Sequence, residues 1–207
     1  KSEGKRGHSP GIEFNLDDLD RVIQNIPKEH LFIYGHSFGG NVLANFLLRK
    51  QPNYLSGAIL SSAWFELAKQ PNILEFAMAN VMNKIAPSFT QNSKIDANHL
   101  SNDPSVCEAY VTDPLNHDKI SVRLFSDFYA AGKWAIKNAD KLPVETLLVH
   151  GADDAIISSH GTVEFTENSK GLAKCKIFEN TKHEPHNDKT HETLFAYTLS
   201  WLESRLD

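Results

Sequence analysis

One serine in this sequence lies among glycines. Residues 35–39 read GHSFG and are followed by Gly40; the apolar run LFIYG comes before the serine, and the amphipathic run NVLANFLLRK comes after it. A G-x-S-x-G pattern between a strand and a helix is typical of a nucleophile elbow, a tight turn that exposes the serine hydroxyl above a sheet. The alternative is a glycine-rich turn with an incidental serine. The flanking patterns favour the elbow and predict that Ser37 is a nucleophile.

A serine hydroxyl needs a histidine that takes its proton and an acid that orients the histidine. In folds with this elbow the acid and the histidine follow the serine in that order, each after a later strand. Asp153 and Asp154 follow the apolar run TLLVHGA, and His183 and His186 come after CKIFENTK. The order predicts one acid and one base from these two pairs. The spacing alone leaves both choices open, and one aspartate is expected to be a turn residue.

The histidines of the last third of the chain also allow a metal-site interpretation. The run HEPH at 183–186 is followed by Asp188 and His191, and these side chains are of the kinds that bind zinc. The serine and aspartate segments, however, explain one of these histidines without a metal, and no other ligand cluster stands out. We therefore expect neither a metal nor a cofactor. Four further histidines are expected to be structural or surface residues: His36, His99, His117 and His150.

Helix and strand patterns alternate around these side chains. A helix is predicted between Asn15, which can cap it, and Pro27, which ends it, from apolar residues three and four positions apart: Leu16, Leu19, Val22, Ile23 and Ile26. Buried strands are predicted within 30–35 and 56–63, and further strands within 144–151 and 173–180. A helix is predicted after Ser37, and a last helix from Thr190 to Arg205. This alternation predicts a mostly parallel sheet flanked by helices, an α/β class fold.

The middle of the chain interrupts this alternation. Between Trp64 and Leu142 there is no strong strand pattern, and several segments are helical in pattern. We therefore expect a helical cap at 66–142, inserted between two core segments at 1–65 and 143–207. An apolar stripe rich in Met and Phe runs through residues 72–89. It is expected either to line an acyl-chain pocket, to rest on a membrane surface, or to pack on the core.

Composition excludes some classes of protein. The 207 residues are 41% hydrophobic and 23% charged, as in ordinary globular proteins. The net charge is −5 and no Lys- or Arg-rich run occurs, so a nucleic-acid partner has no electrostatic support. No apolar run reaches ~18 residues, the length of a membrane span. Cys107 and Cys175 lie far apart without a C-x-x-C spacing, so they are either free thiols in a reducing compartment or one disulfide, and the size of the domain favours free thiols. A cytoplasmic location is expected.

Three sequence blocks resemble one protein family. GHSFGGN, LLVHGADDAIIS and IFENTKHEPHND are similar to the nucleophile, acid and histidine blocks of the monoacylglycerol lipase and lysophospholipase branch of the α/β-hydrolases, which includes serine aminopeptidases. The segment at 100–129 resembles the cap of that family, so the resemblance covers essentially the whole chain. It implies an α/β-hydrolase fold. It favours Asp154, three residues after Gly151, as the acid and His183 as the base.

The resemblance also implies a reaction. Ser37 attacks the carbonyl of a small acyl ester or lipid, His183 acts as general base and then acid, Asp154 orients His183, and the N–H of Phe38 stabilises the oxyanion. A serine aminopeptidase is the alternative, in which acidic cap residues hold the free amine of the substrate. Candidates for that contact are Glu66, Glu75 and Glu108.

The start of the chain departs from the family pattern. KSEGKRGHS is similar to the tail of a GHGxSxG stretch that, in the family, lies after several strands. The chain is therefore expected to begin part-way through the domain, without the loop that supplies a second oxyanion donor. An inactive fragment is for this reason a further alternative.

Overall fold

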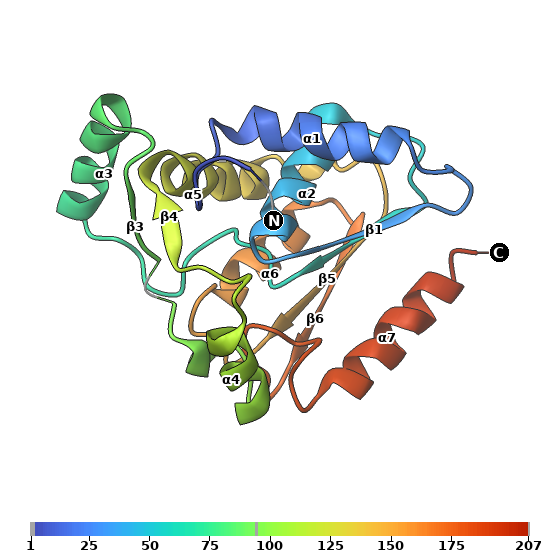
Figure 1. Cartoon of the computed structure of the whole chain (residues 1–207). Coiled ribbons are helices and arrows are strands. Elements are labelled where there is room, and N and C mark those ends of the chain that lie inside the picture. Colours follow the sequence, from blue (N-terminus) through green and yellow to red (C-terminus); the bar gives the residue numbers. More distant parts are fainter. Residues whose placement is uncertain (1–2, 94, 207) are drawn as a thin grey trace.

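The main sheet has four parallel strands. The computed structural model describes residues 3–93 and 95–206, so Lys1 and Ser2 of the polar start and Lys94 lie outside the described residues (Figure 1). The strand order is β1-β2-β5-β6, and every neighbouring pair is parallel. The strands are β1 (Phe32–His36), β2 (Gly57–Ser61), β5 (Thr146–Gly151) and β6 (Ala173–Phe178). The predicted parallel sheet is confirmed.

Helices cover both faces of this sheet. Alternate strand residues point to opposite faces, so Leu60 and Leu148 join one apolar cluster while Ile59 and Leu147 join the other. The first cluster is covered by α1 (Ile12–Gln24), α2 (Phe38–Lys50), α5 (Val122–Lys137) and α6 (Ser159–Asn168). The second is covered by α7 (His191–Glu203), which lies across the sheet from α1 and α2 (Figure 1).

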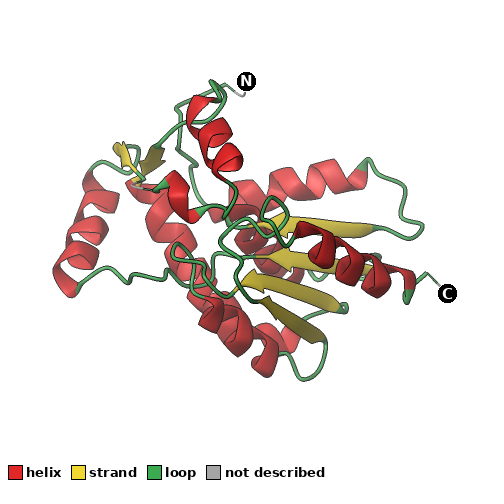
Figure 2. Ribbon diagram, turned by 90° about the horizontal axis from the view of Figure 1, so that it is seen from below, coloured by secondary structure: helices red, strands yellow, loops and turns green. Residues whose placement is uncertain are grey.

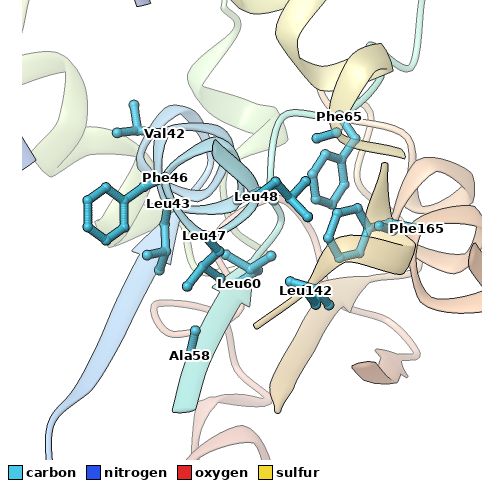
Figure 3. Packing of buried hydrophobic residues seen from close by; sticks show 14 of the residues in the cluster. Val42, Leu43, Phe46, Leu47, Leu48, Ala58, Leu60, Phe65, Leu142 and Phe165 are labelled. Atoms are coloured by element: carbon cyan, nitrogen blue, oxygen red, sulfur yellow. The ribbon is translucent and has the colours of Figure 1, made fainter. Parts of the chain in front are cut away.

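The larger core is centred on α2. Leu43 and Leu47 of this helix lie over Leu60 of β2, and the stacked rings of Phe65 and Phe165 extend the same cluster (Figure 3). Because this helix begins directly after Ser37, the packing that holds α2 on the sheet also fixes the position of the serine.

The first helix differs from its prediction in two respects. It begins at Ile12 after Gly11, and Asn15 accepts a hydrogen bond from the Ser9 hydroxyl instead of capping the helix. Leu16 and Ile23 are buried as predicted, but Val22 and Ile26 are exposed. The reason is geometric: each helical residue turns the chain by about 100°, so Val22 and Ile23 cannot share one face, and Ile26 lies beyond the helix end.

The segment predicted as a helical cap contains two strands. β3 (Thr90–Asn92) and β4 (Lys119–Ser121) pair antiparallel, where the sequence predicted no strand. Three-residue strands are too short for an alternating pattern to show. The other elements here are α3 (Ile73–Ile85), a 3₁₀ turn η1 (Ala97–His99), α4 (Pro104–Thr112) and a second turn η2 (Ala139–Lys141). In Figure 2, α3, β3 and β4 project from one end of the sheet.

Helix α5 lies within the expected cap, residues 66–142, but packs in the core of the main sheet. Phe128, Ala135 and Ile136 of α5 belong to the same buried cluster as α2. Helix α3, in contrast, has no buried residue; Ile73 is 91% exposed, and Leu74 and Met78 are also open to solvent. Of the interpretations for residues 72–89, packing on the core is therefore wrong for most of the stripe.

Strand β1 forms one edge of the sheet. No other described strand pairs with its free side, and an apolar groove of about 490 Å³ lies beside it, lined by residues of β1 and α7 that include Phe32, Tyr34, Leu194 and Phe195. A preceding strand of the kind expected from the sequence would pair here, and that expectation stays a prediction.

The structure also bears on the two cysteines and on the length of the apolar segments. Cys107 and Cys175 are free thiols, as predicted. Within the described ranges, no helix has both the length and the apolar character needed to cross a membrane.

Candidate active site

Ser37 has an unusual backbone conformation at the turn between β1 and α2. Its φ of 51° and ψ of −115° lie outside the regions that residues with a Cβ normally occupy. The conformation is held by main-chain hydrogen bonds: the Ser37 N–H donates to Ser61 O at 2.9 Å, and the Trp64 N–H donates to Ser37 O at 3.0 Å. This is the strained strand-to-helix turn predicted for a nucleophile elbow.

The glycines around Ser37 allow the turn to close. A Cβ on Gly35 would lie 2.6 Å from Gly39 O, and one on Gly40 would lie 2.8 Å from the Ala63 Cβ. Both distances are shorter than any ordinary van der Waals contact. The first turn of α2 therefore packs directly on the ends of β1 and β2.

Replacing Gly35 with alanine is expected to reduce the free energy of unfolding by about 1–3 kcal/mol, because the added methyl group overlaps backbone atoms. Gly39→Ala is the matched control, since a Cβ at Gly39 meets no atom within 4 Å. Urea unfolding of the two variants compares them directly. Equal stabilities would contradict the close approach of α2 to β1.

Ser37, His183 and Asp154 are connected by hydrogen bonds. His183 Nε2 is 2.9 Å from Ser37 Oγ, and His183 Nδ1 is 2.7 Å from Asp154 Oδ2. Asp154 follows β5 and His183 follows β6, so the parallel strands bring both loops to the sheet edge where Ser37 lies. Because a carboxylate only accepts hydrogen bonds, His183 Nδ1 carries the proton and Nε2 accepts from the Ser37 hydroxyl. His183 is 4% exposed and the Asp154 side chain is fully buried.

The competing residues lie outside this chain of hydrogen bonds. Asp153 is exposed, and its N–H donates to Thr181 O at 2.9 Å, as expected of a turn residue. The His186 ring packs against His36 with ring centroids 4.7 Å apart, and its Nδ1 has no partner in the described part of the chain. The structure thus brings together Ser37, His183 and Asp154 from the predicted sets.

Comparisons with known proteins place the chain in a family. Residues 1–190 match the profile of the family described as serine aminopeptidase, S33. The chain belongs to this family. It has the α/β-hydrolase fold and resembles monoacylglycerol lipases: the solved monoacylglycerol lipase of Paleococcus ferrophilus superimposes with a TM-score of 0.91 and 28% identity, over 99% of this chain and 79% of that one.

The chain covers very different shares of two relatives. The monoacylglycerol lipase of Mycolicibacterium smegmatis is 25% identical over 212 residues, which cover 100% of this chain and 75% of that protein. An uncharacterized abhydrolase domain-containing protein of Dictyostelium discoideum is 31% identical over 210 residues. The chain spans only 22% of the length of the Dictyostelium protein.

Asp154, the predicted acid, accepts hydrogen bonds from four donors within the described residues. Asp154 Oδ1 accepts from the N–H groups of Ile156 and Ile157, both at 2.9 Å. Oδ2 accepts from His183 and, at 3.0 Å, from His150 Nε2. Burial by itself raises the pKa of Asp154, but the hydrogen bonds from His150 and His183 outweigh it and hold the pKa well below its usual range. Asp154 is therefore a carboxylate at neutral pH.

His150, which the sequence predicted to be a structural or surface residue, is buried and contacts Asp154. It is fully buried at the end of β5, four residues before Asp154, and its Nδ1 lies 2.8 Å from Thr162 Oγ1. Since Nε2 faces two acceptors, Asp154 Oδ2 and Ile157 O, it carries the proton, and the Thr162 hydroxyl donates to Nδ1. The only sequence signal was its spacing from Asp154 after a predicted strand.

Replacing His150 with phenylalanine is expected to reduce kcat about tenfold to a hundredfold, because Asp154 loses one donor and its orientation. His150→Gln retains an N–H donor and is expected to recover most of the rate. Steady-state kinetics on a soluble ester test this, with KM expected to change little. If Gln and Phe are equally impaired, His150 contributes only packing.

His36 is a half-buried histidine beside the site. Its ring lies 5.0 Å from that of His183, and burial, assisted by His183 and His186, lowers its pKa to about 3 from 6.5. The unfolded chain therefore gains a proton here below pH 6.5, whereas the folded protein gains one only near pH 3. The contribution to stability is complete above pH 6.5 and is lost progressively as the pH falls toward 3.

His36→Gln is accordingly expected to flatten the decrease in unfolding free energy between pH 6.5 and 4, by at most about 1.4 kcal/mol per pH unit. Urea unfolding at several pH values measures the slope. His117→Gln, at an exposed position, is the control and should leave the slope unchanged. A His36→Gln slope equal to that of the parent would mean that His36 protonates freely in the folded state.

The N–H of Phe38, the predicted oxyanion donor, has a defined position at the start of α2. Phe38 is the first residue of α2, so its N–H has no acceptor within the helix, and its ring packs on Phe128 with centroids 4.4 Å apart. The N-terminal end of α2 also favours negative charge at this point. Within the described residues the structure assigns no second donor.

Proposed function

We propose that the protein is a serine hydrolase that cleaves carboxylic esters, with monoacylglycerols, lysophospholipids or similar small acyl esters as substrates. The observation that carries the proposal is the continuous hydrogen-bonded series Ser37–His183–Asp154, with donor–acceptor distances of 2.9 and 2.7 Å. A serine hydroxyl in this arrangement transfers its proton to the histidine as it attacks a carbonyl carbon.

The reaction proceeds through an acyl-enzyme. Ser37 Oγ bonds to the ester carbonyl carbon while its proton moves to His183 Nε2, and the resulting oxyanion accepts a hydrogen bond from the Phe38 N–H. His183 then protonates the leaving alcohol oxygen as the ester bond breaks. In the second half, His183 takes a proton from water, the water oxygen attacks the acyl carbon, and Ser37 leaves with that proton. Asp154 stabilises the imidazolium in both halves.

The similarity to monoacylglycerol lipases supports an acyl ester as the substrate. Helix α3 supports a lipid source for it, because Ile73, Leu74, Met78 and Ile85 are exposed on one short helix. Apolar side chains of this kind enter the headgroup region of a lipid surface. We therefore include transient contact of α3 with lipid as part of the proposal, with no nucleic-acid partner.

A fluorophosphonate probe tests the nucleophile. Intact-mass measurement is expected to show one adduct on the parent protein, mapped by peptide sequencing to Ser37, and none on Ser37→Ala. Hydrolysis of a monoacylglycerol with a medium-length chain is then expected from the same sample. A folded protein that takes up no probe would overturn the proposal and leave the inactive-fragment interpretation.

Peptidase activity is the second candidate, because the family profile is that of serine aminopeptidases. The three candidates for holding the substrate amine have different surroundings. Glu75 caps α3 with Asn72, Glu66 pairs with His160, and Glu108 is exposed on α4. Comparing kcat/KM for a p-nitrophenyl ester and an aminoacyl p-nitroanilide separates the candidates. An anilide rate that exceeds the ester rate would favour the peptidase.

A further inference from the structure

Three side chains outside the active site converge on one point of the surface. Glu66 lies in the loop after β2, and His160 and Glu164 lie one turn apart on α6. One carboxylate oxygen from each glutamate and one imidazole nitrogen all lie within 4.8 Å of one another. Because His160 and Glu164 are four residues apart on a helix, they project from the same face.

The spacing suits a shared ion better than a direct hydrogen bond. Glu66 Oε2 and His160 Nδ1 are 3.6 Å apart, beyond hydrogen-bonding distance. Two ligand atoms on a tetrahedral zinc ion, each about 2.1 Å from the metal, are about 3.4 Å apart. Apart from this ion pair, none of the three side chains makes a hydrogen bond within the described part of the chain.

The backbone holds Glu66 in place against α6. Glu66 O accepts from the Ser158 N–H at 2.9 Å, and Leu67 forms an antiparallel bridge with Ile157. The stem of the Glu66 side chain lies over Gly161, where a Cβ would come within 3.2 Å of the Glu66 Cγ. The Glu66 side chain is consequently only 24% exposed, while His160 is 75% exposed. The Glu66 backbone is therefore held beside the turn of α6 that carries His160.

We propose that Glu66, His160 and Glu164 bind a divalent transition-metal ion, preferably Zn²⁺, with water as the fourth ligand. Two carboxylates neutralise the ion, and the imidazole selects Zn²⁺ over Mg²⁺ and Ca²⁺. The ion links the loop between β2 and α3 to the first two turns of α6. These turns follow the Ile156–Ile157 segment whose N–H groups hold Asp154. The site is separate from the proposed catalytic residues and does not depend on the hydrolase activity.

Thermal unfolding and calorimetry with Zn²⁺ test the site on protein first treated with a chelator. At a Zn²⁺ concentration about 100-fold above Kd, the Tm is expected to rise by about 5–10 °C. Mg²⁺ at the same concentration is expected to leave the Tm unchanged. His160→Ala and Glu66→Gln are each expected to weaken Zn²⁺ binding at least about tenfold.

Two controls locate the ion. Glu167→Gln, at an exposed position on the same helix, is expected to retain parental Zn²⁺ affinity. His183→Ala is expected to retain it too, which separates this site from binding at the catalytic histidine. The absence of any Tm change or heat of binding up to 1 mM Zn²⁺ would overturn the proposal. Parental affinity in folded His160→Ala, or lost affinity in His183→Ala, would overturn it as well.

Discussion

Replacement of Ser37 with alanine is expected to lower kcat for a soluble p-nitrophenyl ester by about 10⁶-fold. The loss is large because proton acceptance by His183 and orientation by Asp154 act only through the serine oxygen, which lies 2.9 Å from His183 Nε2. Only the Phe38 N–H and substrate binding then contribute to the residual rate. The measurement is steady-state hydrolysis at saturating ester, with KM expected to stay within a few-fold of the parent.

Ser62→Ala is the matched control. Ser62 is buried, has a φ of 41° close to the 51° of Ser37, and its hydroxyl has no partner in the described part of the chain. Loss of that hydroxyl is expected to leave kcat near the parental value. If Ser37→Ala is folded and retains more than about one tenth of the parental kcat, Ser37 is not the nucleophile.

Replacement of Asp154 with asparagine is expected to lower kcat by about 10⁴-fold while the protein stays folded. The present tautomer of His183 requires an acceptor at Nδ1, and Asp154 Oδ2 provides it at 2.7 Å. All four contacts to the carboxylate come from donors. An asparagine NH₂ group must therefore face a donor on one side, which favours the wrong tautomer or rotates the side chain.

Asp153→Asn separates the two aspartates that the sequence spacing left open. Asp153 is exposed and outside the hydrogen-bonded series, so its variant is expected to retain kcat within about twofold. The pH–rate profile of Asp154→Asn should also change, because the stabilisation of the imidazolium is lost. A greater loss in Asp153→Asn than in Asp154→Asn would show that the wrong acid is assigned here.

Local sequence patterns predicted most of what positions the serine. The glycines on both sides of Ser37 and the change from an apolar run to an amphipathic run indicated the elbow, and the observed φ of Ser37 agrees with it. Three of the four strands were visible as short apolar runs, whereas β6 alternates lysines with apolar residues. Folds with this elbow carry the acid and the histidine after later strands, in that order. This order indicated the segments that hold Asp154 and His183.

Only the tertiary structure decided contacts between distant segments. The partnership of His183 with Ser37 spans 146 residues, and that with Asp154 spans 29. Periodicity describes which face of an element is apolar, but not which other element covers that face. For this reason the sequence did not show that α5 packs in the core while α3 stays exposed.

The same reason explains two residues whose surroundings the sequence did not predict. His150 was one histidine among ten until packing placed its Nε2 3.0 Å from Asp154. Glu66 gained its partners on α6 because the loop after β2 pairs with the segment after β5. Sequence by itself determined the chemistry-bearing residues and their order along the chain. The packing of helices and loops on the sheet decided which of them meet, because those distances depend on atoms that are far apart in the sequence.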